Sequence, residues 1–107
     1  MIDHRRIVQI LPAPSDSYVL FLGNRPDGCS VSPVVCLALV DRWESDERYC
    51  AVPDTATREV LPMIETDGFI SIPDDAVNYQ GYYSQAAALE LLRERLSELC
   101  AKDTVKA

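Results

Sequence analysis

The sequence has few of the residues on which common catalytic and nucleotide-binding sites depend. Its 107 residues include one histidine and only four glycines. A Ser–His–Asp or Cys–His arrangement would have to use His4, which lies in a charged stretch at the start of the chain. Glycine-rich phosphate-binding loops and the H-E-x-x-H zinc motif are absent from the sequence. We therefore expect no catalytic residue, no cofactor and no nucleotide site.

Long apolar runs and zinc-type cysteine spacings are also lacking. The longest apolar run, residues 33–40, is far shorter than the roughly 18 residues that a membrane span needs. We expect no secretory signal, because the charged stretch at residues 3–6 precedes only a short apolar segment. The cysteines form no C-x-x-C pair and match no zinc or redox signature; they are Cys29, Cys36, Cys50 and Cys100. We expect a cytoplasmic location, reduced cysteines and no metal site.

Positive charge is scarce, and the deficit lies in one part of the chain. Ten Lys and Arg residues face 17 Asp and Glu residues, which gives a formal net charge of −7. The charges of residues 1–40 balance, as do those of 76–107, so the whole excess falls in 41–75. This distribution disfavours direct binding to nucleic acid or to anionic membranes. It favours a positively charged partner, because a concentrated field of one sign steers association.

Short apolar segments separated by turn residues predict a β body over residues 5–73. The turn residues of Asn24–Gly28 and of Asp67-Gly68 indicate hairpins, and Pro62 inside an apolar segment indicates a sheet edge or a bulge. The expected strands are Arg5–Leu11, Tyr18–Leu22, Ser32–Trp43, Tyr49–Val52, Val60–Ile64 and Phe69–Ile72. This spacing predicts an α+β, mainly β fold: a small antiparallel barrel or strongly bent sheet of five to six short strands, in the size class of SH3-like and OB-like barrels.

One amphipathic helix is expected over residues 84–101, after a tyrosine-rich connector at 74–83 and before a tail at 102–107, within a single domain. Ser84 is a suitable N-cap for this helix. Four leucines at spacings of 3, 4 and 3 form one stripe: Leu89, Leu92, Leu96 and Leu99. We expect the stripe to cover an open side or end of the sheet, and the alternative is that it pairs two copies as a homodimer.

Acidic and aromatic side chains supply the candidates for a contact surface. Exposed carboxylates near turns stay ionised, and tyrosine provides a large contact area at low entropy cost. The alternative for the rings is that they close one end of the sheet. The candidate set is Asp41, Trp43, Glu44, Asp46, Glu47, Tyr49, Asp74, Asp75, Tyr79, Tyr82 and Tyr83.

Together these patterns favour a non-catalytic binding module that engages a basic protein partner. Its sharpest form is an inhibitor that imitates nucleic acid, of the kind that phages or mobile elements could encode. Two alternatives stay open. One is a small-molecule-binding barrel or minor enzyme that uses a tyrosine-lined cleft, and the other is an accessory subunit that docks or dimerises through its helix.

Overall fold

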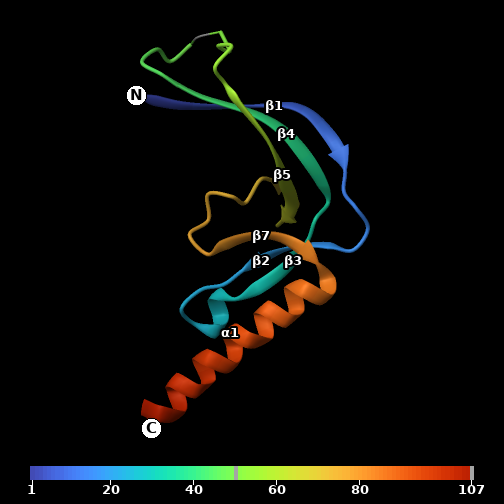
Figure 1. The fold of residues 1–107 in the computed structure, drawn as a ribbon, viewed down its shortest axis with the longest axis vertical. Helices are drawn as coiled ribbons and strands as arrows, with labels where there is room; N and C mark the ends of the chain where they lie inside the picture. Colours follow the sequence, from blue (N-terminus) through green and yellow to red (C-terminus); the bar gives the residue numbers. More distant parts are fainter. Residues whose placement is uncertain (50, 107) are drawn as a thin grey trace.

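The computed structural model describes residues 1–49 and 51–106, with side chains up to residue 101. In these residues, seven antiparallel strands form two sheets, and one helix follows them (Figure 1). The larger sheet has the order β1-β4-β5-β6 and curls into a half-barrel, and the smaller has the order β3-β2-β7. The elements are β1 (Ile2–Pro12), β2 (Ser17–Phe21), η1 (Pro26–Gly28), β3 (Ser30–Pro33), β4 (Cys36–Ser45), β5 (Thr57–Thr66), β6 (Phe69–Ser71), β7 (Tyr79–Ser84) and α1 (Gln85–Lys106). The mainly β, antiparallel class with one C-terminal helix is as predicted.

Two of the predicted turns and the helix cap are confirmed. Asp67 and Gly68 have φ angles of 53° and 86°, which suit the tight turn that joins β5 to β6. The 3₁₀ turn Pro26–Gly28 joins β2 to β3, and these two strands pair antiparallel. At the start of α1, the backbone N–H of Ala87 donates to Ser84 Oγ at 3.3 Å, which is the expected N-cap bond.

The segment expected as one central strand over 32–43 is divided between the two sheets. Val34 N donates to Ser17 O at 3.0 Å, beside the smaller sheet, whereas Val35 N donates to Met63 O at 2.8 Å in the larger one. The chain therefore changes sheets at this point. Pro33 precedes the change, and its missing N–H ends β3. Beyond it, β4 is central as predicted, because it pairs with both β1 and β5.

Two other expectations about strands are wrong. No strand is found over Tyr49 and residues 51–52, which lie in the connection between β4 and β5, while Cys50 is outside the described residues. In contrast, residues 79–84 form β7 rather than a connector and pair with β2. The reason is that tyrosine packs well on a pleated surface. Gly81, with a φ of 105°, accommodates the register shift in this pairing.

Pro62 lies inside β5, where its neighbours explain why it is tolerated. Leu37 of β4 is opposite Pro62, but β6 pairs with β5 only over 64–66. At Pro62 the sheet therefore has a strand on one side only, so β5 is locally an edge. The predicted edge position is confirmed at this residue, although β5 as a whole is an inner strand.

The core has one part in each sheet. In the larger sheet, Ala38 and Val40 of β4 pack with Leu61 and Met63 of β5. In the smaller sheet, Val19 and Leu20 of β2 are fully buried, and α1 contacts β2, β3 and β7. The helix therefore covers the smaller sheet. Its most buried side chains are Ala88 and Leu99, at 0% and 7% exposed, whereas Leu89 is 39% exposed. No helix in the described part of the chain has both the length and the apolar character to cross a membrane.

Candidate functional site

An acidic residue of the candidate set, Asp41, lies at the centre of an ion-paired row that crosses three strands. Arg6 of β1 and Arg58 of β5 are its partners on either side in the sheet register. Arg58 donates from Nε to Oδ1 at 2.8 Å and from Nη2 to Oδ2 at 3.2 Å, and Arg6 Nη2 is 3.7 Å from Oδ2. The hydrogen bonds from Arg58 hold the pKa of Asp41 below its ordinary value. Its side chain is 7% exposed, so it is not part of an accessible acidic surface.

A second set of arginines neutralises acids on the opposite face of the same sheet. Arg5 Nη1 donates to Asp74 Oδ1 at 2.8 Å, and Arg42 Nη2 is 3.9 Å from Asp74 Oδ2. Arg42 Nη1 also donates to Glu59 Oε1 at 3.1 Å. In the β1–β4 register, Arg5 lies opposite Arg42, and the next residue, Arg6, lies opposite Asp41. Successive residues of a strand point to opposite faces of the sheet. The sheet therefore has a neutralised cluster on each face.

The other seven acids of residues 41–75 are all exposed and lie in three places. The connection from β4 to β5 holds the largest group; it is here named the acidic hairpin and defined as residues 44–55. Glu44, Asp46, Glu47 and Asp54 are exposed. In the described part of the chain, none of these four carboxylates has a Lys or Arg nitrogen within 4.0 Å. The same hairpin carries the exposed Arg48, so its formal charge is −3, and the exposed acids Glu65, Asp67 and Asp75 lie outside it. The acidic hairpin lies at one end of the half-barrel (Figure 1).

The base of the acidic hairpin is held by polar and aromatic contacts. Ser45 Oγ donates to Glu47 O at 2.8 Å, and His4 Nε2 lies 2.9 Å from Ser45 Oγ. The His4 ring stacks on Trp43 with a centroid distance of 5.3 Å and an interplanar angle of 9°. The only histidine of the chain thus has a structural position here, next to the acidic residues.

A polar groove of about 430 Å³ borders the acidic hairpin. It is lined by Asp3, Arg42, Trp43, Glu44, Thr55 and Thr57. Asp3 and Glu44 contribute carboxylates to it, while Arg42 contributes one guanidinium group. These side chains can accept and donate hydrogen bonds. Within the described residues, no three His, Cys, Asp or Glu side chains gather in a way that could hold a metal ion.

The candidate tyrosines do not form one group. Tyr49 is 86% exposed in the acidic hairpin, whereas the other three lie on β7 in the smaller sheet. Tyr79 packs edge-to-face on Phe21, with centroids 6.5 Å apart, and burial followed by the nearby Asp74 charge raises its pKa. Tyr82 and Tyr83 are 38% and 37% exposed. Asp75 is exposed and lies in the connection from β6 to β7. Of the candidate aromatic residues, Tyr49 lies in the acidic hairpin and Trp43 directly precedes it, whereas the other three lie on β7.

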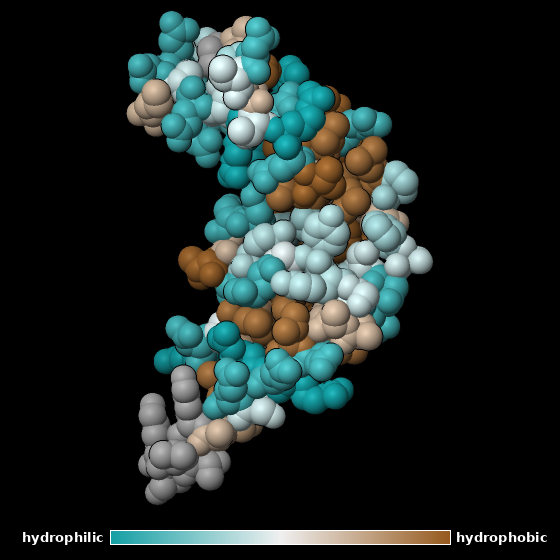
Figure 2. Space-filling view, viewed as in Figure 1, coloured by the Kyte–Doolittle hydropathy of each residue, from teal (hydrophilic) through white to brown (hydrophobic). Residues whose placement is uncertain are grey.

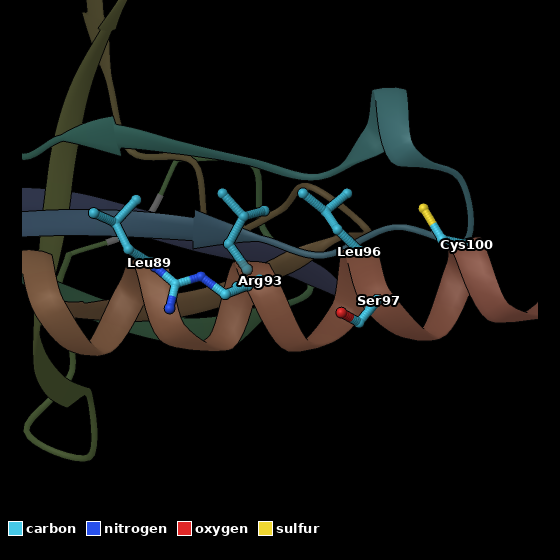
Figure 3. A pocket seen from close by; sticks show the side chains of 6 residues that line it. Leu89, Arg93, Leu96, Ser97 and Cys100 are labelled. Carbon is cyan, nitrogen blue, oxygen red and sulfur yellow. The ribbon is translucent and has the colours of Figure 1, made fainter.

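The candidate leucines of α1 also divide into two groups. Leu99 is buried, but the other three line an apolar groove of about 500 Å³ together with Arg93, Ser97 and Cys100 (Figure 3). The side chains of Leu89, Leu96 and Cys100 lie on one side of the helix in this view. Arg95 Nη1 donates to Gly23 O at 3.2 Å, which fixes the helix against the connection between β2 and β3.

The arginine partners of Asp41, Glu59 and Asp74 are the feature of these acids that sequence reasoning missed. A signal was present, because acids and arginines are adjacent in Asp41-Arg42 and in Arg58-Glu59. It can be interpreted only once the strand register is known. Comparison of the chain with protein-family models, with curated proteins and with solved structures found no match.

Proposed function

We propose that this protein is a small, acidic, non-catalytic binding module that engages a basic protein partner through the acidic hairpin. One observation carries the proposal, namely the contrast between two sets of carboxylates. Asp41, Glu59 and Asp74 are ion-paired with arginines of the sheet. Glu44, Asp46 and Glu47 are exposed close together in sequence where β4 ends and the β4–β5 connection begins, beside the exposed Arg48.

The electrostatics of this arrangement support binding rather than catalysis. Carboxylates two or three residues apart are separated by distances of the order of the screening length, which is about 8 Å at physiological salt, so a cationic surface meets much of their charge jointly. Such a field increases the rate of association with a basic partner. Tyr49, at 86% exposure, adds an aromatic ring of the type that anchors protein interfaces.

The finer form of the proposal is an inhibitor that occupies a nucleic-acid-binding surface of its partner. Proteins bind nucleic acid largely through Lys and Arg contacts to phosphates. Exposed carboxylates can occupy the same cations, because they offer charged acceptor oxygens to these donors. A partner bound in this way should be released when duplex DNA or RNA is added in excess.

The test is affinity capture from the native host with two matched variants. One variant carries Glu44→Gln, Asp46→Asn and Glu47→Gln in the acidic hairpin. The control carries Glu90→Gln, Glu94→Gln and Glu98→Gln on α1, so both lose three negative charges. We expect the hairpin variant alone to lose the partner, which is identified by mass spectrometry.

A salt titration of the captured complex completes the test. We expect the affinity for the partner to fall steeply with salt concentration, and the fall to be shallower for the hairpin variant. Equal behaviour of the two variants, or an affinity indifferent to salt, would refute the proposed function. Release by duplex nucleic acid separates the inhibitor form from other modes of binding.

A further inference from the structure

The chain exposes more surface than a compact monomer of its mass. Its accessible surface is 7398 Å², whereas a compact monomer of 11.9 kDa exposes about 6,000 Å². Its radius of gyration is 17.1 Å, against about 13 Å for a compact chain of this length. The surplus is roughly 1,400 Å², which is larger than the roughly 800 Å² per subunit that a standard interface buries. The surface needed for a stable dimer is therefore available.

One group of exposed aliphatic side chains lies close together on β1. Ile7, Val8 and Ile10 are 45%, 40% and 52% exposed, and apolar side chains gather over β1 and β4 in Figure 2. β1 is the outer strand of the larger sheet, so within the described residues its far edge pairs with no strand. A long edge strand with unpaired backbone groups and exposed aliphatic side chains is a template for another strand. The register irregularity between Ile7 and Gln9 leaves most of the length of β1 regular.

We propose that β1 pairs antiparallel with β1 of a second copy, which joins the two four-stranded sheets across a two-fold axis. A two-fold relation makes the two strands antiparallel and each copy offers the same surface. With the axis at Ile7 the whole of β1 overlaps, and Arg6 and Arg5 then lie opposite Val8 and Gln9. No like charges are opposed in this register, and like charges directly opposite would be destabilising.

A second copy also fits better here than the basic partner proposed above. β1 carries only one acid, Asp3, and its two arginines are already paired with Asp74 and Asp41, so the strand offers no acidic surface to a basic partner. In addition, the start of β1 lies beside the acidic hairpin and its end lies far from it, because Ile2 is opposite Ser45 and Pro12 is opposite Cys36 in the sheet register. Antiparallel pairing of full-length β1 strands therefore places the two acidic hairpins at opposite ends of the joined sheet. The dimer leaves both hairpins accessible and does not depend on their function.

Light scattering coupled to size-exclusion chromatography tests this proposal with three single variants. Ile10→Lys places an ammonium group on β1 at a position already 52% exposed, so the fold should be retained. Ile70→Lys does the same on β6, the opposite edge of the sheet, at 53% exposure, and Leu89→Lys does so in the helix groove at 39%. We expect a wild-type mass of about twice 11.9 kDa, a monomeric Ile10→Lys protein with unchanged circular dichroism, and two dimeric controls.

Hydrogen exchange gives a second measurement that needs no variant. The proposal predicts that the backbone amides of β1 exchange more slowly as wild-type protein concentration increases, whereas those of β6 do not change. A monomeric wild type, or a β1 whose exchange is independent of concentration, would overturn the proposal. The proposal would also be overturned if the Leu89→Lys protein were monomeric and the Ile10→Lys protein dimeric, because that result assigns the interface to α1.

Discussion

Asp41 on β4 and Arg58, directly opposite on β5, form a two-point ion pair at 2.8 Å and 3.2 Å. Two parallel hydrogen bonds of this kind constrain geometry more than a single contact does. Arg6 approaches the same carboxylate from β1 at 3.7 Å. One acid thus connects three strands of the half-barrel, and its role is in the fold rather than in the exposed acidic surface.

Substituting Asp41→Asn should lower the thermal unfolding midpoint. The amide offers one oxygen acceptor in place of two, so Arg58 loses a hydrogen bond and both arginines lose their counter-charge. The control is Asp46→Asn in the acidic hairpin, where the side chain is exposed. This substitution should change the free energy of unfolding by no more than about 0.5 kcal/mol. Circular dichroism melting at neutral pH measures both. A midpoint for Asp41→Asn equal to that of the control would contradict the role assigned to this pair.

Low pH should also remove the contribution of the Asp41–Arg58 ion pair to the free energy of unfolding. Hydrogen bonds from Arg58 hold the pKa of folded Asp41 below its ordinary value of 3.8. The unfolded state therefore binds the proton more tightly, so the contribution of the pair is complete above that value and is lost as the pH falls through the lowered folded pKa. Denaturant unfolding measured at decreasing pH should show a steeper loss of stability below 3.8 for wild type than for Asp41→Asn. Parallel curves would exclude this linkage.

At the alkaline end, Tyr79 should have the opposite effect. Burial, and then the Asp74 charge, raises the pKa of its phenol above 10.0. The folded state holds this proton more tightly than the unfolded state does, so the stability it contributes is complete below 10.0 and is lost as the pH rises through the folded pKa. Tyr79→Phe should flatten the decline in unfolding free energy at high pH. The control Tyr49→Phe, at an 86% exposed position, retains Tyr79 and therefore retains the decline.

The sequence allowed the hairpins and the helix to be predicted because their signals are local. Asp67-Gly68 can adopt positive φ angles, and Ser84 can cap the helix, whatever the rest of the chain does. The tyrosines of β7 favour a strand, but no local feature indicates that a strand forms here. They form a strand because β2 lies beside them, and this contact joins residues about 60 positions apart.

The net charge of each segment can be counted from the sequence, but the positions of the charged side chains in the fold cannot be predicted from it. All of the net charge falls in 41–75, yet Asp41 and Asp74 are paired with arginines from β1 and from the inner strands. Recognising these pairs requires the β1–β4–β5 register, in which Arg6, Asp41 and Arg58 form one row. Net charge by segment therefore overestimates the acidic surface, whose exposed carboxylates lie in the acidic hairpin and, apart from it, at Glu65, Asp67 and Asp75.

Replacing Leu99 by alanine should separate the two sides of α1. Leu99 is 7% exposed, on the side of the helix that covers the smaller sheet, while Leu89 is 39% exposed in the groove. Leu99→Ala should lower the free energy of unfolding by about 2–5 kcal/mol, because it removes buried methyl groups and leaves a cavity. Leu89→Ala should cost less than about 1 kcal/mol, because its side chain is already partly in water. Denaturant unfolding monitored by circular dichroism measures both changes, at a fixed protein concentration so that any self-association contributes equally. Equal losses from the two substitutions would mean that the helix does not use this side to cover the sheet.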